Sequence, residues 1–201
     1  MASRPNTVSQ PGPGDHPPLE ITKENFKPCH MFFYGSLMDK DVLQIAARLP
    51  SPPELRPASI SGWQVKMWGS YPTLVPASTT PATSPSPGPL SPSTANANAD
   101  HHHDNNKIRG MAWELKTFEQ FSNLRTYETS HYQPRAVVIR AEGGGEEEGE
   151  VPGEWEGLTF VWAGDPSSPD LEEGSFDLEV YQQTTKKYIF GLGGGEEASW
   201  N

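Results

Sequence analysis

The sequence predicts a single α+β domain whose sheet is curled and largely antiparallel. Stretches with the two-residue alternation of a strand recur along the chain, and stretches with helical spacing interrupt them. Most strand-like stretches meet the next one through a short turn, which favours antiparallel pairing. With 21 Pro, 19 Gly and 34% hydrophobic residues, the chain of 201 residues is expected to place roughly 130–150 of them in one compact core.

The first predicted elements are a strand and a helix. Residues 30–34 form an apolar, aromatic strand that leads into Tyr-Gly-Ser. Asp39 is a suitable N-cap for the next helix, and Pro50 is expected to end it. Residues 51–57 are expected to be a connector. The apolar residues of the helix recur at helical spacing: Val42, Ile45, Ala46 and Leu49.

The remaining elements alternate between strand and helix. Thr117 followed by Gln120 three residues later is typical of a capping box, so a helix is expected to begin there. The β-branched run at 137–139 favours a strand. In order, we expect a hairpin over 62–76, a strand over 108–115, a helix over 117–129, strands over 131–142 and 154–164, and a final helix over 175–191.

Composition divides the chain into folded and disordered parts. Residues 1–25 are rich in Pro, Gly and polar residues and are expected to form a disordered lead-in. The folded domain is expected over 26–193. A disordered insertion at 77–106, which has almost no apolar content, and an acidic loop at 142–154 interrupt it. Residues 194–201 are expected to be a disordered tail.

The acidic balance excludes several classes of partner. A net charge of -11 argues against a nucleic-acid partner, because neutralising phosphates needs clustered Lys and Arg. The same charge disfavours an anionic membrane surface. No apolar stretch reaches the roughly 18 residues that span a bilayer, and the N-terminus lacks the apolar region of a secretory signal. We therefore expect a soluble, cytoplasmic protein, and its oligomeric state stays open.

Two sequence features bear on metal and thiol chemistry. Cys29 is the single cysteine, which excludes an intramolecular disulfide and a cysteine-rich metal site and favours an inert, half-buried thiol. The contiguous histidines at 101–103 lie within the low-complexity insertion and lack the spacing of a metal site on a helix. We expect no dedicated metal site and no cofactor.

Glu128 is the most informative single residue. On the predicted helix, Phe118, Phe121 and Leu124 follow one another at three-residue steps, and Glu128 is next on this stripe. Burying a carboxylate without a partner raises its pKa, which makes it a more effective base near neutral pH. Two alternatives remain open: a solvated carboxylate in a frayed last turn, or a salt bridge to Arg125 or Arg135.

The segment YGSL, residues 34–37, ends the first strand just where a helix is expected to begin. Backbone N–H groups at such a turn suit a carboxylate or a developing oxyanion. Nucleotide binding has little support, because no phosphate-binding loop motif occurs and GLGGGEE follows a helix. A hydrolase built on Ser36 lacks a G-x-S-x-G motif, and a partner role for His131 stays open.

Six short motifs follow one another along the chain in the order YGSL, D-x-x-V-L, G-W-x-V, Y-P-x-L-V-P, G-x-x-W-x-L and L-x-x-Y-E-x-x-x-Y. Taken together, these motifs resemble the gamma-glutamylcyclotransferase-like family, with the gamma-glutamylamine cyclotransferases and the avirulence-induced plant proteins as the most similar branch. The resemblance covers about residues 32–190 outside the insertion and the acidic loop.

The resemblance implies a fold and a site. It implies a small curled, mixed, mostly antiparallel β-barrel with flanking helices, and a pocket at the strand-end loop. The implied site residues are Glu128 as general acid/base, Tyr34, Gly35, Ser36 and Leu37 as the substrate-binding loop, and Tyr71, Pro72 and Tyr132 as pocket walls.

It also implies a reaction. The free α-amine of a gamma-glutamyl compound would attack its own γ-carbonyl and release 5-oxoproline and an amine, without a cofactor, as an acyltransferase or lyase does. The leaving amine stays open. Relatives commonly carry an arginine where this chain has Pro134, with Arg135 one residue further on. The alternative function is therefore a non-catalytic relative that binds a small carboxylate or a partner protein.

Overall fold

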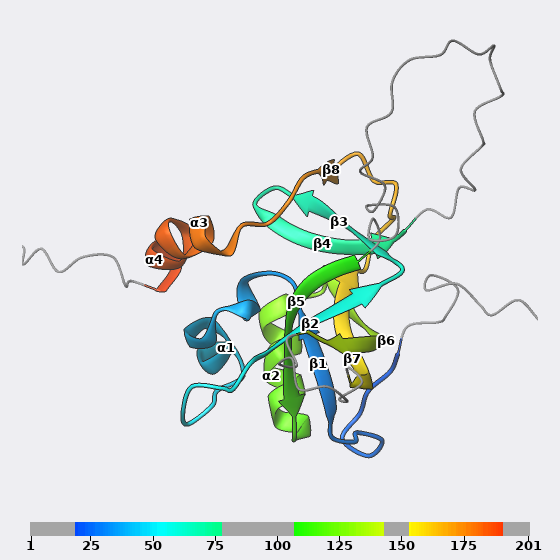
Figure 1. The fold of residues 1–201 in the computed structure, drawn as a ribbon, viewed down its shortest axis with the longest axis vertical. Helices are drawn as coiled ribbons and strands as arrows, with labels where there is room; N and C mark the ends of the chain where they lie inside the picture. The colour runs from blue at the N-terminus through cyan, green and yellow to red at the C-terminus, as the bar shows by residue number, and fades with distance from the viewer. Residues whose placement is uncertain (1–18, 78–106, 143–152, 191–201) are drawn as a thin grey trace, which may run out of the picture.

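The computed structural model describes residues 19–77, 107–142 and 153–190, and its centre is a closed five-stranded barrel (Figure 1). Strand β1 pairs parallel with β7, and the other four strand pairs of the barrel are antiparallel. The predicted α+β fold, a mixed and mostly antiparallel barrel with flanking helices, is therefore confirmed. In spatial order the strands are β1 (Cys29–Phe33), β5 (Lys107–Leu115), β2 (Arg56–Ser61), β6 (Tyr132–Ala141) and β7 (Glu154–Trp162).

A second, three-stranded sheet lies beside one end of the barrel (Figure 1). It contains β3 (Trp63–Trp68) in the middle, flanked by β4 (Tyr71–Pro76) and the short β8 (Glu172–Glu173). Strands β3 and β4 form the predicted hairpin, and Gly69 takes a positive φ of 58° in its turn. This conformation costs glycine little, which explains the turn at that position.

Two helices, α1 and α2, cover the outside of the barrel, and two short helices near the C-terminus lie beside the start of α1 (Figure 1). Helix α2 begins with the predicted capping box: the Thr117 hydroxyl accepts from the N–H of Gln120, and the Gln120 side chain accepts from the N–H of Thr117. The helical elements are the 3₁₀ turn η1 (Ser36–Met38), α1 (Lys40–Ala46), α2 (Phe118–Glu128), α3 (Leu178–Gln183) and α4 (Thr185–Phe190). Among the described residues, no helix is long and apolar enough to cross a membrane.

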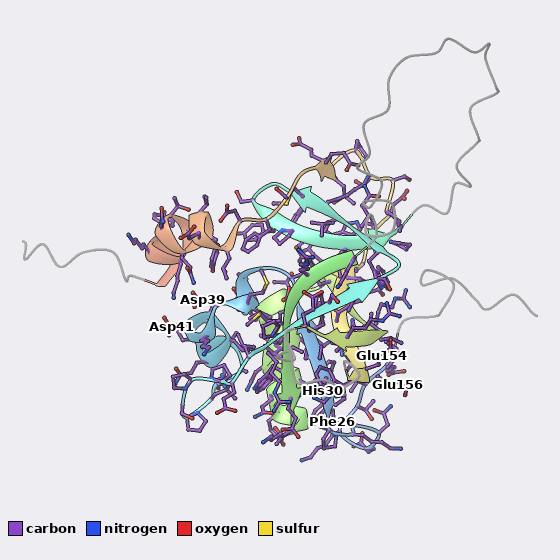
Figure 2. The ribbon with its side chains drawn as sticks, viewed as in Figure 1. Phe26, His30, Asp39, Asp41, Glu154 and Glu156 are labelled. Carbon is purple, nitrogen blue, oxygen red and sulfur yellow. The ribbon has the colours of Figure 1, made fainter. Side chains whose placement is uncertain are left out.

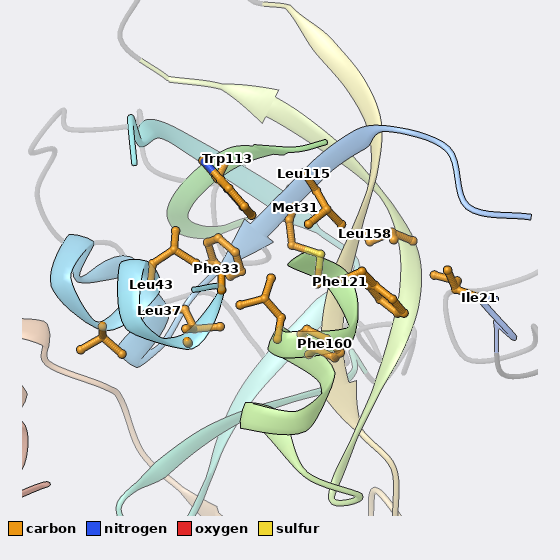
Figure 3. Close-up of a cluster of buried hydrophobic side chains, with 14 of the residues drawn as sticks. Ile21, Met31, Phe33, Leu37, Leu43, Trp113, Leu115, Phe121, Leu158 and Phe160 are labelled. Atoms are coloured by element: carbon orange, nitrogen blue, oxygen red, sulfur yellow. The ribbon is translucent and has the colours of Figure 1, made fainter. Parts of the chain in front are cut away.

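Successive side chains of β1 point to opposite faces, and this alternation separates two hydrophobic clusters. Phe32 joins a cluster with residues of all five barrel strands, which is therefore the barrel interior. Met31 and Phe33 join the outer cluster, where α1 and α2 cover the barrel wall. Figure 3 shows this outer cluster, in which Phe121 of α2 lies among side chains of β1 and β7.

The structure differs from the sequence expectations at five points. Helix α1 ends at Ala46 and not just before Pro50. Part of the expected connector over 51–57 belongs to strand β2, because Ala58 and Ile60 supply side chains to the barrel interior. The two-residue strand β8 was not expected. The final helix is divided into α3 and α4, because Thr184 leaves helical geometry with φ of -115° and ψ of -83°. Ile21, assigned to the lead-in, is 9% exposed and packs in the outer cluster, so the folded part begins before residue 26.

Several expectations fall outside the described residues. They concern nearly all of the insertion at 77–106 with its histidines, most of the acidic loop at 142–154, and the tail at 194–201. The division of the chain into these segments stays a prediction.

Replacing Gly110 with alanine is expected to destabilise the fold by about 2 kcal/mol or more. A Cβ at Gly110 of β5 would overlap the Phe33 carbonyl oxygen and lie 2.7 Å from the Phe32 ring, so β1 and β5 could no longer approach as closely. Urea unfolding followed by circular dichroism measures the change.

The matched control is Gly153→Ala, because a Cβ at Gly153 meets only the Trp155 ring at ordinary contact distances of 3.6 Å and more. This control is expected to stay within about 0.5 kcal/mol of the wild type. Equal stabilities of the two variants would contradict the packing described for β5.

Candidate functional site

A pocket of about 430 Å³ opens between the end of β1, the β3–β4 turn and the end of α2. Every residue that the resemblance assigned to the site lines it. The structure therefore brings together segments that are almost 100 positions apart in the chain. The predicted residues in the lining are Tyr34, Gly35, Ser36, Leu37, Tyr71, Pro72, Glu128 and Tyr132.

The substrate-binding loop predicted at 34–37 is shaped by a close backbone approach. Gly35 takes an extended conformation, with φ of -133° and ψ of -145°, and a Cβ on it would lie 2.9 Å from Cγ of Pro72. Glycine is therefore needed here for space, because the buried Pro72 of β4 packs against the loop. Leu37 is 3% exposed and attaches the loop to the outer cluster.

The backbone N–H groups of this loop are left largely without hydrogen-bond acceptors among the described residues. In the described part of the chain, Gly35, Ser36 and Leu37 donate no hydrogen bond to a backbone carbonyl, whereas the next two N–H groups bond back to the carbonyls of Gly35 and Ser36. Free N–H groups beside a pocket are suited to bind an anion or an oxyanion.

Tyrosine hydroxyls connect the walls of the pocket. Tyr127 and Ser36 share a hydrogen bond of 3.0 Å between their hydroxyl oxygens. Tyr34 donates to the Phe160 carbonyl at 2.9 Å, and Tyr132 donates to the Pro72 carbonyl at 3.1 Å. Burial raises the pKa of Tyr34, Tyr127 and Tyr132, with a further contribution from the Glu128 charge, so these phenols stay protonated at neutral pH.

Glu128 is the last residue of α2 and faces the pocket. Phe121 and Leu124, on the same stripe, are 1% and 0% exposed, which confirms the predicted burial of that face. The Glu128 carboxylate forms no hydrogen bond or ion pair with another described side chain, and burial raises its pKa to about 8. Glu128 lies within the helix and is half-buried, so it is in a regular turn at the pocket wall and is not fully enclosed. Desolvation is the one cause of its pKa shift, which argues against a salt bridge to Arg125 or Arg135.

The backbone ends the helix immediately after Glu128. Thr129 takes φ of 64° and ψ of -168°, a conformation that is strained for a β-branched residue. Its hydroxyl lies 3.0 Å from Nδ1 of His131. His131 therefore pairs with Thr129, while Ser36 pairs with Tyr127, and the arrangement gives no serine–histidine pair.

The helix-terminus contribution expected at 34–37 needs a correction. Ser36 and Leu37 of the loop already belong to the 3₁₀ turn η1, and Asp39, which follows this turn, caps α1 by accepting from the N–H groups of Asp41 and Val42. The N-terminus of α1 is thus occupied by a side chain of the protein itself. Only the N–H groups of the loop remain for a ligand.

Asp39 also binds side chains of the two C-terminal helices. Lys186 of α4 donates to both carboxylate oxygens of Asp39 at 2.8 Å and to Asp41 at 2.8 Å, and Gln182 of α3 donates to Asp39 at 2.6 Å. Burial opposes ionisation of Asp39, but these donors outweigh it, so the pKa of the Asp39 carboxyl lies below its usual value. Figure 2 shows Asp39 and Asp41 at the start of α1, beside α3 and α4.

Sequence reasoning missed several pocket residues. Trp68 follows the alternating part of the hairpin, and its ring stacks on His131 with centroids 4.4 Å apart. Tyr127 immediately precedes Glu128 in the chain, but only the fold shows that it reaches Ser36. The aromatic residues on either side of the tight turn, Trp68 and Tyr71, were the one feature of the sequence that could have indicated an aromatic pocket wall. The unpredicted lining residues are Phe32, Phe33, Trp68, Tyr127, Thr129, His131 and Phe160.

Metal ligands are not gathered in the described part of the chain, where no group of three or more His, Cys, Asp or Glu side chains could bind an ion. The pocket chemistry available there consists of one carboxylate, free backbone N–H groups, tyrosine phenols, the hydroxyls of Ser36 and Thr129, and the His131 imidazole.

Comparison with protein families adds an independent observation. Residues 31–84 match the family described as gamma-glutamyl cyclotransferase, AIG2-like. This segment contains YGSL and Y-P-T-L-V-P, so the resemblance to the gamma-glutamyl cyclotransferase family is confirmed there. A comparison with curated proteins returns no significant match.

Solved structures with a similar backbone include two from Arabidopsis thaliana. One is 21% identical and is aligned over 86% of this chain and 92% of that chain, with a TM-score of 0.49. The other is 15% identical, over 86% and 83%, also with a TM-score of 0.49. A structure titled gamma-glutamyl cyclotransferase is 9% identical, over 68% and 67%, with a TM-score of 0.40.

Replacing Lys186 with methionine is expected to destabilise the protein by roughly 3 kcal/mol at pH 7, because it leaves the buried Asp39 carboxylate without its cation. Urea unfolding measures the effect. Lys187→Met is the matched control, since Lys187 is exposed and lies next to Lys186 in the same helix.

The effect is expected to depend on pH. The pKa of Asp39 is lowered in the folded state, so the ion pair stabilises above the unfolded carboxyl pKa of about 3.9 and this contribution is lost as the pH falls through the folded value. The difference between Lys186→Met and the wild type should therefore shrink below about pH 4. A difference that is absent at pH 7, or equally large at pH 2, would contradict the ion pair.

Proposed function

We propose that the protein is a cofactor-independent gamma-glutamylcyclotransferase-like enzyme that acts on a small gamma-glutamyl compound. The observation that carries the proposal is the Glu128 carboxylate, whose pKa is raised to about 8 in the pocket that the loop at 34–37 also lines. The family match over residues 31–84 supports the same class of enzyme.

In the proposed reaction, the substrate's α-amine nitrogen attacks its own γ-carbonyl carbon. A carbon–nitrogen bond forms within a five-membered ring, and the bond from the same carbon to the leaving nitrogen breaks. The products are 5-oxoproline and an amine, so atoms balance without an external nucleophile or a redox partner. The protein has to fold the substrate into the attacking geometry, which contributes several kcal/mol in favourable cases.

Glu128 is proposed to carry the proton between the two nitrogens. As a carboxylate it accepts a proton from the substrate's α-ammonium, and as a carboxylic acid it donates this proton to the departing nitrogen. A pKa of about 8 suits both steps near neutral pH, because neither form is far in free energy from the other. A pKa near the ordinary value of about 4.3 would make the carboxylate a much weaker base.

The loop at 34–37 is proposed to bind the substrate's charged oxygen. Its free N–H groups suit the α-carboxylate or the tetrahedral oxyanion, and known oxyanion donors are worth roughly 3 kcal/mol each. The Ser36–Tyr127 hydrogen bond fixes the loop to the end of α2, one residue before Glu128. Tyr71, Pro72 and Tyr132 are proposed as walls that exclude water.

Wild-type protein is expected to release 5-oxoproline from at least one member of a panel of gamma-glutamyl amines and dipeptides. Glu128→Gln is expected to lower kcat by 10²-fold or more, because glutamine cannot transfer the proton. The kcat/KM of the wild type should rise with pH toward a plateau above about 8, since the deprotonated form of Glu128 accumulates there.

Glu119→Gln is the matched control: Glu119 is exposed in the first turn of the same helix, so its replacement should leave turnover unchanged. Full turnover by Glu128→Gln would refute the assigned base. If the folded wild type releases no 5-oxoproline from any member of the panel but binds a small carboxylate tightly, a non-catalytic binding protein is favoured instead.

A further inference from the structure

One wall of the pocket is a cluster of aromatic rings, to which the proposed reaction assigns no role beyond that of Tyr71 as a wall. The Trp68 ring lies 4.4 Å from the His131 ring, 5.5 Å from Trp162 and 6.2 Å from Tyr71, measured between centroids. The rings come from the β3–β4 turn, the start of β6 and the end of β7. Trp68, Tyr71 and His131 also line the pocket, so their surfaces are available to a ligand there.

Much of this aromatic surface is open. Tyr71 is 49% exposed, one of few large hydrophobic side chains with so much exposed surface among the described residues. His131 is also exposed. An aromatic patch at the mouth of a concave site is typical of ligand binding, because stacking and burial of a ring there release water from both partners.

The charges of the pocket restrict what can lie against these rings. The lining residues in the described part of the chain include no Lys and no Arg, and Glu128 is the only carboxylate. His131 is the one basic side chain in this lining, so a leaving group with its own carboxylate would lose hydration without meeting a Lys or Arg and would lie near Glu128 whenever that residue is ionised. A leaving group without a carboxylate avoids both costs.

The position of the aromatic cluster relative to Glu128 indicates which part of the substrate the cluster would contact. Glu128 ends α2, and the chain passes through Thr129 to His131, whose ring stacks on Trp68. If the loop at 34–37 binds the glutamyl part and Glu128 protonates the leaving nitrogen, the group on that nitrogen extends toward Trp68 and Tyr71. This step rests on the proposed function.

We propose that Trp68, Tyr71 and His131 form a subsite for the leaving amine, and that this subsite selects an aromatic amine without a carboxylate. The preferred substrate class is then a gamma-glutamyl aryl or arylalkyl amide. Gamma-glutamyl dipeptides, whose leaving amino acid carries a carboxylate, are disfavoured.

The test compares three substrates that differ only in the leaving amine: gamma-glutamyl benzylamide, gamma-glutamyl methylamide and gamma-glutamylglycine. For the wild type, kcat/KM for the benzylamide should exceed that for the methylamide by about tenfold and that for the glycine compound by more. Trp68→Leu, which keeps an apolar side chain, should lose most of the benzylamide preference, measured as the ratio of the kcat/KM values for the benzylamide and the methylamide. Tyr188→Leu, on a 92% exposed side chain of α4, is the control.

Binding of the same three compounds is measured in parallel by calorimetry. The full-length Glu128→Gln variant is used, and also the wild type if it turns over none of them. Turnover without any benzylamide preference would overturn the subsite and leave the proposed function intact. Selective benzylamide binding that Trp68→Leu abolishes, without turnover by the wild type, would support the subsite and refute the proposed function. Equal binding of the three compounds, or a loss in Trp68→Leu that is the same for all three, would also overturn the subsite.

Discussion

The central physical constraint in this protein is a pocket-facing carboxylate, that of Glu128, which is half-buried and has no charged partner among the described side chains. Removing a charge from water costs free energy, and a protein normally offsets that cost with a cation or with several hydrogen-bond donors. Glu128 has neither among the described side chains, and its raised pKa is the result. A residue in this state lowers the stability of the fold at neutral pH, so its position must be enforced by the packing around it.

That packing begins in helix α2. The capping box at Thr117 determines where the helix starts, and Phe121 and Leu124 fix its rotation against the barrel. With start and rotation fixed, the residue one turn after Leu124 has to face the pocket. The Thr129 backbone then ends the helix at a strained φ of 64°. Strain of this kind persists where surrounding structure over-determines it, as in many functional sites.

The opposite side of the pocket is fixed by contacts that are distant in sequence. Gly35 allows the loop to approach Pro72, and Tyr127 holds Ser36 through its hydroxyl. Behind the loop, Asp39 caps α1 and binds Lys186 of α4, which connects the C-terminal helices to the strand-end loop. The candidate site is therefore a product of the whole fold, although its reactive group is a single side chain.

The sequence allowed much of this to be predicted, for identifiable reasons. Helix α2 has a capping box and an apolar stripe, both local signals, and they placed Glu128 on the apolar face of the helix. Its proposed role came from the resemblance to the family and not from the helix alone. Strand β2 was missed because Pro57 and the adjacent polar residues obscure the strand pattern in the sequence. Only two side chains of this segment reach the barrel interior. The Trp68–His131 stack and the Lys186–Asp39 pair could not be predicted, because they join segments that only the tertiary fold brings together.

The most direct test of the account is an NMR titration of the Glu128 side-chain carboxyl carbon, assigned by its absence from the Glu128→Gln spectrum. The account predicts a midpoint near pH 8, because burial without a partner is the cause of the shift. A midpoint near the ordinary glutamate value of about 4.3 would show a solvated or paired carboxylate and would contradict the account.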